Sequence, residues 1–449
     1  LTLSATLSDI DRNSPVNNQG GDYPTVTVSV WDPWQDPTWD SNGLNTRFNY
    51  GQTLGTHHLT ASAYYGEDVR KRLYLTATGA TAMETEWWQQ GGKLMDEIQW
   101  ALGTTSLGSD FTQLYDHGVD DTKTERVRKL GLFAQHQFEL IPHVDMTLGL
   151  RYENVNNWTS NWSNGSLHNT AYPKFVKREF DSIIPKSFTT WKMDHIAPWF
   201  RDTSLSAGVS RIWHAPDYHG DYNPQGRPAG IFLDPEHGMG YDLIFSRRMW
   251  RNINLKAGYA FYRIKDYIAT NSKYDIYGGA GAGALRYSDY KINLDTVHRH
   301  ATTLEISGNL TDDLSCYASW AWQRFFNQGD EPAGETELDQ RAEHQVGAGL
   351  RYTITDKATL MVDYTYQSAE VTEVSNQISA TVWEFYQVQN PAYQVVDLGL
   401  SYQCFETLGF FKEGTLNLYV KNLFDEFYYD ASGYPATDRT IGISFQVTL

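Results

Sequence analysis

The chain has 449 residues and a net charge of −18, and it contains no run rich in Lys and Arg, so nucleic acid is disfavoured as a partner. It also lacks the run of about 18 apolar residues that a membrane helix needs. Mean hydropathy is −0.51, yet 14% of the residues are aromatic. That combination is typical of transmembrane β-barrels, whose lumen and loops are polar and whose interfaces carry aromatic girdles. The acidity fits a solvated outer surface or the capture of cationic or metal-bearing ligands.

Alternation of apolar and polar residues predicts about eighteen strands, because successive side chains on a strand point to opposite faces. From Met146 to Tyr152 the even-numbered residues are apolar and the odd-numbered ones polar or small, and Val346–Tyr352 repeats the pattern. Glu97–Ala101 would also suit a helix turn. The predicted strands are Leu1–Asp9, Gly43–Thr53, His57–Tyr65, Lys93–Gly103, Asp110–Gly118, Arg128–Leu140, Val144–Glu153, Thr190–Phe200, Thr203–Trp213, Gly238–Arg247, Ile253–Ile268, His298–Leu310, Leu314–Phe326, His344–Thr353, Ala358–Gln367, Tyr393–Phe405, Thr415–Leu423 and Arg439–Leu449.

The connections between these strands alternate between short turns and long segments. Long segments such as the one after Tyr65 and Asn154–Lys186 lie toward one rim, and short turns such as Ile141–His143 and Arg201-Asp202 toward the other. Outer-membrane barrels show this asymmetry, and closure of the sheet pairs every backbone amide in lipid. A soluble solenoid or propeller would need a fixed repeat period, which the chain lacks. The predicted fold is an all-β, transmembrane antiparallel barrel.

The two cysteines, Cys316 and Cys404, lie on the apolar faces of their predicted strands. Two other strands separate them, and at about 4.8 Å per strand this is too far for a disulfide. We therefore expect both to be small lipid-facing residues. Leu1 opens directly in a strand-like run, so we expect the N-terminus to be processed or incomplete.

The C-terminal stretch resembles the closing segment of TonB-dependent outer-membrane receptors. In that family an Asn-Leu-Phe-Asp motif follows a strand, then come Gly-Tyr-Pro, an Arg and a final alternating strand. The matching residues here are Asn422, Leu423, Phe424, Asp425, Gly433, Tyr434, Pro435, Arg439 and Phe445. Segments such as Leu132–Gln135 and Ser210–Pro216 resemble the same family in the same order. The chain ends in Leu449, whereas such receptors usually end in Phe or Trp.

The resemblance implies a barrel of 22 strands that imports a scarce nutrient through the outer membrane of a Gram-negative bacterium, with energy from the TonB complex. It implies no catalysis and no cofactor. The chain is expected to be one barrel domain, residues 1–449, without the plug and the first strands. Expected partners are outer-membrane lipid or lipopolysaccharide, TonB through a plug, and a chelate such as a ferric siderophore, with a monomer as the expected state. Cobalamin, haem or a glycan are alternative cargoes, and a passive porin-like channel of about eighteen strands is the alternative function.

Aromatic residues in the long segments are candidate ligand contacts. Trp31, Trp34 and Trp39 lie beside Asp residues in the first long segment, and Trp87 and Trp88 lie near Glu residues in the second. Such rings could stack on a sugar or an aromatic chelate. The alternative is that these rings pack within their own loops at the membrane interface.

A second group of candidates follows the strand that ends near Trp213. His214, Tyr218, His219 and Tyr222 could ligate iron or haem, or hydrogen-bond a chelate, although they could equally be ordinary polar loop residues. Arg227 and Arg286 could pair with anionic groups of a ferric siderophore, because a guanidinium is a bidentate donor. No metal site is predicted, because no Cys/His ligand spacing occurs.

Overall fold

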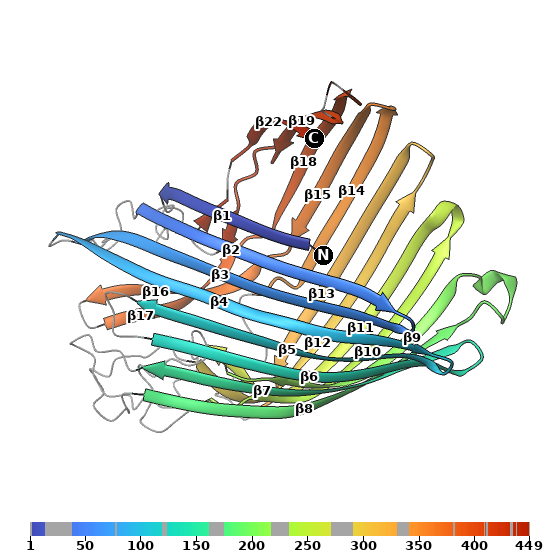
Figure 1. Ribbon diagram of the computed structural model, residues 1–449. Coiled ribbons are helices and arrows are strands. Elements are labelled where there is room, and N and C mark those ends of the chain that lie inside the picture. The colour runs from blue at the N-terminus through green and yellow to red at the C-terminus, as the bar shows by residue number, and fades with distance from the viewer. Residues whose placement is uncertain are drawn as a thin grey trace.

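The computed structural model describes residues 2–13, 38–76, 79–118, 124–160, 175–216, 233–270, 291–329, 341–379, 382–407, 409, 412–431, 434–436 and 438–448. Most of these residues form one antiparallel sheet of 18 strands that curves round on itself (Figure 1). In the part of the chain so described, no helix is long and apolar enough to cross a membrane.

The strands of the sheet pair with their neighbours in chain order. They are β1 (Thr2–Asn13), β2 (Thr38–Leu54), β3 (His57–Thr76), β4 (Gly79–Trp100), β5 (Gly103–Gly118), β6 (Thr124–Ile141), β7 (Val144–Ser160), β8 (Phe175–Lys192), β9 (Thr203–His214), β10 (Glu236–Met249), β11 (Ile253–Thr270), β12 (Lys291–Asn309), β13 (Leu314–Asn327), β14 (His344–Thr355), β15 (Ala358–Gln367), β18 (Tyr393–Phe405), β19 (Glu413–Lys421) and β22 (Thr440–Thr448).

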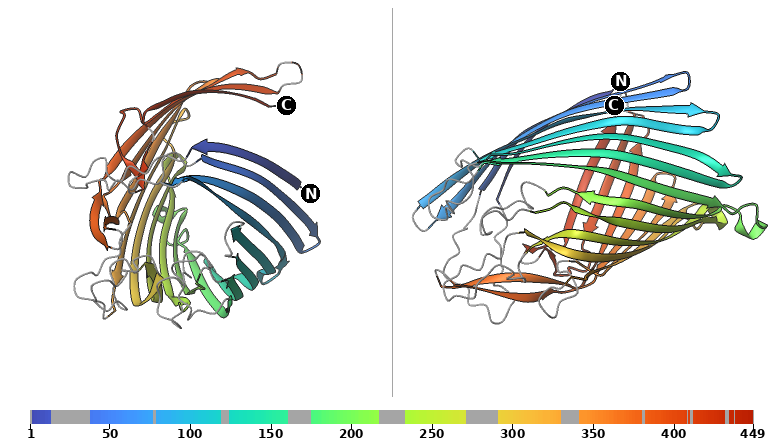
Figure 2. Two further views of the ribbon diagram at one scale, coloured as in Figure 1. Left: turned by 90° about the vertical axis from the view of Figure 1, so that its left-hand side faces the viewer. Right: turned by 90° about the horizontal axis from the view of Figure 1, so that it is seen from below.

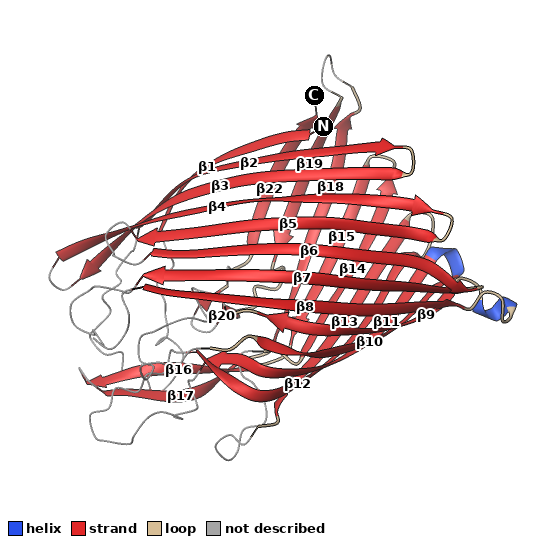
Figure 3. Ribbon diagram, turned by 60° about the horizontal axis from the view of Figure 1, so that its bottom comes forward, coloured by secondary structure: helices blue, strands red, loops and turns tan. Residues whose placement is uncertain are grey.

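Two small hairpins and two short helices complete the secondary structure. One hairpin is β16 (Glu370–Ser379) with β17 (Val382–Asn390), and the other is β20 (Tyr429–Ala431) with β21 (Tyr434–Pro435). The 3₁₀ helices η1 (Pro198–Phe200) and η2 (Trp250–Asn252) lie at the rim of short connections, as Figure 3 shows in blue.

The two edge strands of the sheet do not meet. Among the described residues β1 pairs only with β2, and β22 pairs only with β19. Figure 2 shows the curved sheet with these edges apart. The eighteen strands therefore do not close on themselves, as a porin-like barrel of eighteen strands would.

The predicted alternation defines the two faces of the sheet. On β7 the even-numbered Leu148 and Leu150 are 43% and 52% exposed, whereas the odd-numbered Arg151 lies among carboxylates on the other face. On β14 Leu350 is likewise 48% exposed. Large apolar side chains that face away from the polar side indicate a surface suited to lipid. The all-β fold and its faces are thus as the sequence predicted.

Several predicted long connections are in fact strand. The segment after Tyr65 continues as β3 to Thr76, and β4 begins at Gly79, so the prediction of a long loop there was wrong. Similarly, Asn154–Lys186 is largely β7 and β8. Once both faces of a strand are in water, polarity no longer alternates, although the backbone ladder can continue.

The predicted strand Thr190–Phe200 was also wrong. β8 ends at Lys192, and a connection containing η1 leads to β9, so the turn is longer than Arg201-Asp202 alone. Pro198 lies at the start of η1 and lacks the N–H that a ladder needs. The helix-turn alternative for Glu97–Ala101 is not adopted, because β4 runs to Trp100. Cys316 and Cys404 are free thiols on β13 and β18, with β14 and β15 between them.

Two clusters of buried apolar residues lie toward the rim of long connections. One cluster joins Leu294, Val297 and Phe325 from β12 and β13. Another joins Val127, Val155, Phe180 and Ala215 from β6, β7, β8 and the residue after β9. These clusters hold neighbouring strand ends together.

Candidate functional site

The inner face of the sheet carries a charged network on β5 and β7. The guanidinium of Arg151 donates from Nη1 and Nη2 to the two carboxylate oxygens of Asp110, at 2.7 and 2.8 Å. Its Nε donates to Glu153 at 2.8 Å. Parallel donation by a guanidinium to a carboxylate fixes both groups in one geometry. The three side chains form a rigid polar site on the inner wall.

A glycine makes this contact possible. Gly131 on β6 is the register partner of both Asp110 and Glu153, so it lies between the paired groups. A Cβ at Gly131 would overlap the guanidinium of Arg151. Arg151 therefore crosses a whole strand to reach Asp110 because that strand has no side chain there.

The same arrangement recurs on the opposite part of the wall. The hydroxyl of Tyr317 on β13 donates to Asp363 on β15 at 2.7 Å, across Gly349 of β14. On β3, Tyr64 approaches Thr112 of β5 at 3.1 Å between hydroxyl oxygens. The inner wall thus presents side chains that are fixed by partners two strands away.

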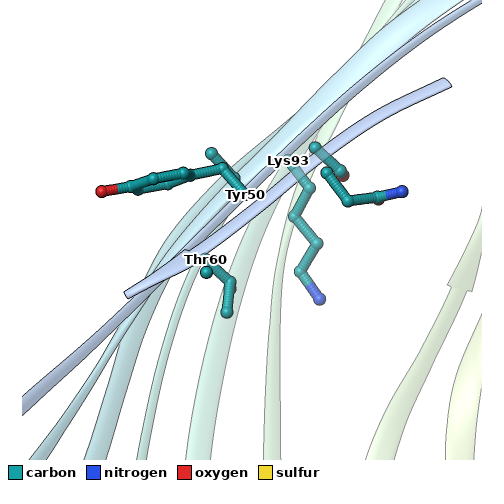
Figure 4. A pocket seen from close by; sticks show the side chains of 7 residues that line it. Tyr50, Thr60 and Lys93 are labelled. Atoms are coloured by element: carbon teal, nitrogen blue, oxygen red, sulfur yellow. The ribbon is translucent and has the colours of Figure 1, made fainter. Parts of the chain in front are cut away.

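A shallow pocket of about 320 Å³ opens on this face near the first strands. It is lined by residues of β2, β3 and β4, among them Thr60, Ser62 and Lys93. Figure 4 shows Thr60 and Lys93 extending to one side while Tyr50 extends to the other. The pocket and the Arg151 network thus place cations and carboxylates on the inner face of the sheet.

Most of the predicted ligand contacts lie outside the described residues. Only the backbone of Trp39 is described, and it belongs to β2, not to a loop. The candidates outside the described residues are Trp31, Trp34, Tyr218, His219, Tyr222, Arg227 and Arg286.

Trp87 and Trp88 are on β4, not in a loop. Trp88 has the parity of Leu94 and Trp100, which are 57% and 58% exposed on the outer face. Its ring stacks on Tyr115 at 5.1 Å between centroids, and Arg126 lies 5.7 Å above Tyr115. This position supports the interface alternative for Trp88, since aromatic rings are typical of the girdle of a barrel.

His214 is described and has an acidic neighbour. Its Nδ1 lies 3.7 Å from Glu236 Oε2 across the β9–β10 pair. The imidazole is 51% exposed, so it remains accessible from the rim of long connections. Among the described residues, no group of three or more His, Cys, Asp or Glu could hold a metal ion.

The C-terminal motif forms a tight corner after β19. Asn422 and Asp425 both have positive φ, 52° and 58°. The Asn422 side chain donates to the carbonyl of Glu426 and accepts from its N–H, both at 2.8 Å. Asp425 accepts the N–H of Arg439 at 2.8 Å and so connects the corner to β22. Gly433 lies outside the described residues, Tyr434-Pro435 forms β21, and Phe424 is 73% exposed.

An antiparallel meander with an apolar outer face and a polar inner face defines the wall of a transmembrane β-barrel. The chain belongs to the TonB dependent receptor-like, beta-barrel family, whose model matches residues 2–423. Members of this family are outer-membrane receptors that bind ligands and interact with TonB, and the family is one of transporters, not of enzymes. No curated protein matches this sequence.

Solved structures share the fold at low sequence identity. The pyoverdine receptor FpvA of Pseudomonas aeruginosa PAO1 has a TM-score of 0.70 at 15% identity over 99% of this chain and 68% of its own. The ferric yersiniabactin receptor FyuA of Yersinia pestis has 0.68 at 13% over 98% and 65%. The ferric-catecholate receptor Fiu of E. coli K12 has 0.65 at 12% over 91% and 64%. The chain therefore spans less than two thirds of FyuA and of Fiu.

Proposed function

We propose that this chain forms the barrel wall, residues 1–449, of a TonB-dependent importer in the outer membrane of a Gram-negative bacterium, and that its cargo is a ferric siderophore or another metal chelate. The observation that carries the proposal is the family match over residues 2–423. The solved relatives named above support the cargo class, since their names specify pyoverdine, ferric yersiniabactin and ferric catecholates.

The faces of the sheet are consistent with this role. The outer face suits lipid, so the importer would stand in the membrane as a monomer surrounded by outer-membrane lipid. The inner face carries the Arg151–Asp110–Glu153 network, whose charges can hold a plug or guide a polar chelate. A ligand that arrives from outside would meet the rim of long connections first, where His214 is exposed.

Uptake of defined iron complexes tests the proposal. The gene that encodes this chain is expressed in cells without other siderophore receptors, and ⁵⁵Fe-labelled complexes of a catecholate, yersiniabactin, pyoverdine and citrate are offered in turn. We expect one complex to accumulate in cells with TonB and not in cells without it. Expression that is equal in iron-poor and iron-rich medium, together with no uptake of any complex, would count against iron as the cargo.

We retain ten sequence candidates as proposed ligand contacts and exclude Trp88, because its position on the outer face of β4 favours the membrane interface. The ten are Trp31, Trp34, Trp39, Trp87, His214, Tyr218, His219, Tyr222, Arg227 and Arg286. The double variant His214→Gln/His219→Gln tests the pair that could touch the metal chelate. Weaker uptake with unchanged surface expression supports contact, and unchanged uptake supports a purely local role for His214 beside Glu236.

A further inference from the structure

The ends of β10, β11 and β12 at the rim of long connections are joined by side chains as well as by the backbone ladder. Asn293 of β12 accepts the N–H of Asp234 at 2.8 Å, and its amide donates to the carbonyls of Asp234 at 2.9 Å and of Asp266 at 2.6 Å. The carboxylate of Glu236 on β10 accepts the N–H of Ile268 on β11 at 2.7 Å. These contacts hold three neighbouring strand ends together.

Asp266 of β11 has an irregular backbone at this point. Its φ is 51°, in the left-handed region, which Asp accepts more readily than most residue types. In the register of the described residues, Asp266 has no partner on β12, although its two neighbours do. Its Oδ2 lies 3.3 Å from Nδ1 of His237 on β10, and both side chains are partly exposed. At the break in the ladder, a carboxylate thus lies beside an imidazole of the neighbouring strand.

Asp266 lies beyond the part of β11 that would cross the membrane. Ile253 begins β11 at the short-connection end, and Asp266 follows thirteen positions later, about 43 Å along a strand. At a strand tilt of about 40° this corresponds to a height of about 33 Å, which exceeds the apolar band of about 25 Å. The groups around Asp266 are therefore on the water side of the rim.

Charges of both signs face Asp266. The carboxylates of Asp234 and Asp295 repel it, whereas Lys265 and the protonated ring of His237 attract it. Burial raises the pKa of the Asp266 carboxyl, and the charges of Asp234 and Asp295 add to the increase, while His237 and Lys265 oppose it. The rim cluster, as we call this group, consists of Asp234, His237, Asp266, Asn293 and Asp295.

Two further charged groups border the rim cluster. The guanidinium of Arg178 on β8 lies 3.9 Å from a carboxylate oxygen of Asp234, whose side chain is 72% exposed. The Glu236 oxygen that does not accept the Ile268 N–H lies 3.7 Å from Nδ1 of His214. Because His214 is a proposed ligand contact, the strand ends that the cluster joins also carry part of the proposed binding surface.

The charge of His237 changes the electrostatics of the rim cluster. An imidazole ordinarily gains its proton near about pH 6.5, so at pH 6 a positive ring faces the carboxylate of Asp266. At pH 8 the ring is neutral, and the carboxylates of Asp234, Asp266 and Asp295 repel one another with one cation fewer among them. The raised pKa of Asp266 acts in the same direction at lower pH, because the folded chain favours its neutral form and that contribution is lost as the pH rises. The strand ends should thus be held more firmly in mild acid.

We propose that the rim cluster is a pH-sensitive junction, which holds the ends of β10, β11 and β12 together while His237 is protonated and loosens when His237 is neutral. The hydrogen bonds of Asn293 and Glu236 do not depend on that proton, so the expected response is local opening and not unfolding. Glu236 is the register partner of His214, so opening would also disturb the carboxylate beside His214 and weaken ligand binding there at pH 8. This last consequence rests on the proposed function, whereas the junction itself rests on the contacts at the rim.

Hydrogen exchange of the purified full chain in lipid nanodiscs tests the junction, because backbone amides exchange through local opening. Exchange is followed by mass spectrometry at pH 6 and pH 8, and each rate is divided by the intrinsic rate at that pH. We expect the peptides that contain Asp234 and Ile268 to be protected about threefold less at pH 8, an effect of the size that a partly exposed ion pair gives. Peptides of β15, which contains no histidine, should be equally protected at both pH values.

Variants identify the group that titrates. His237→Gln should show the lower protection at both pH values, because glutamine stays neutral. Asp266→Asn keeps a residue type that accepts positive φ and removes the charge, so it should also abolish the pH dependence. His58→Gln, at the short-connection end beside Thr53, is the matched control and should behave as wild type. Equal protection of the wild type at pH 6 and pH 8, or a pH dependence that persists in His237→Gln, would overturn the proposal.

The exchange measurement needs no cargo. Failure of the importer function would appear as no uptake of any ⁵⁵Fe complex while the exchange difference between pH 6 and pH 8 is still present. Failure of the junction would appear as loss of that exchange difference in the wild type, whatever the uptake.

Discussion

Arg151 on β7 is joined to Asp110 on β5 by two hydrogen bonds of 2.7 and 2.8 Å that pass over Gly131 of the strand between them. The two side chains are 32% and 30% exposed, so the pair is partly shielded from water by the wall itself. Three strands are thus locked in register by one side-chain pair on the inner face. The pair requires glycine at position 131, because a side chain there would occupy the space of the Arg151 guanidinium.

Asp110→Asn should lower the free energy of unfolding by about 1 kcal/mol, because the pair is charge-assisted but open to solvent on the inner side. Gly131→Ala should cost a similar amount, since its Cβ would displace the guanidinium of Arg151. The two losses should not add in the double variant, because each removes the same contact. Guanidinium-induced unfolding in lipid vesicles measures all three values. Glu305→Gln serves as the control, because it removes an exposed carboxylate on the inner face of β12. Fully additive losses in the double variant would show that Asp110 and Gly131 do not act through one contact.

The strand positions could be predicted because a period of two is visible wherever one face is apolar and the other polar. The ends of β3, β4, β7 and β8 could not be predicted, because polar residues occur on both faces there and the alternation is lost, although the strands continue. The Arg151–Asp110 pair was also missed. The two residues are 41 positions apart in sequence, and only the register through β6 brings them together. A glycine at an inner-facing position was the one available signal.

The candidate ligand residues could not be assigned from sequence for a different reason. Trp88 was grouped with loop residues because Trp beside acidic residues resembles a ligand contact, whereas its strand position and its stacking on Tyr115 suit a membrane interface. In contrast, the C-terminal motif could be assigned from sequence, because its Asn and Asp occupy positive φ positions that few other residue types accept. A local backbone requirement leaves a local sequence signal, and a ligand contact assembled from distant segments does not.

Asn422→Ala should lower the free energy of unfolding by about 2 kcal/mol. The residue is 4% exposed, and alanine would remove both side-chain hydrogen bonds to Glu426. Alanine would also hold a positive φ at a cost of about 1 kcal/mol. Asn422→Gly removes the same hydrogen bonds without that strain and should therefore be less damaging. Asn417→Ala on the preceding strand is the control, and equal effects of alanine and glycine at position 422 would argue against a role for the backbone.

Leu418→Arg and Asn417→Arg compare the two faces of β19 at neighbouring positions. Leu418 is 41% exposed on the apolar face, so an arginine there should cost about 2–4 kcal/mol near the middle of the bilayer. Asn417 faces the polar side and should accept arginine with a smaller loss. Their register partners, Ile443 and Ser444 on β22, should show the same contrast. Similar losses on both faces, measured as the yield of folded protein in vesicles, would contradict the assignment of the faces.

Single cysteines at the two rims test which rim faces outward. In a background with Cys316→Ala and Cys404→Ala, Gln328→Cys places a thiol at an exposed position just beyond β13, on the long-connection side. Leu102→Cys places one in the turn between β4 and β5, where the side chain is 81% exposed. We expect a membrane-impermeant maleimide to label Gln328→Cys on intact cells and Leu102→Cys only after the outer membrane is permeabilised, because long connections of such barrels are extracellular and short turns periplasmic. As a control, both cysteine variants are labelled after denaturation, and equal labelling then shows that they are expressed at equal levels. The opposite order of labelling would invert the orientation.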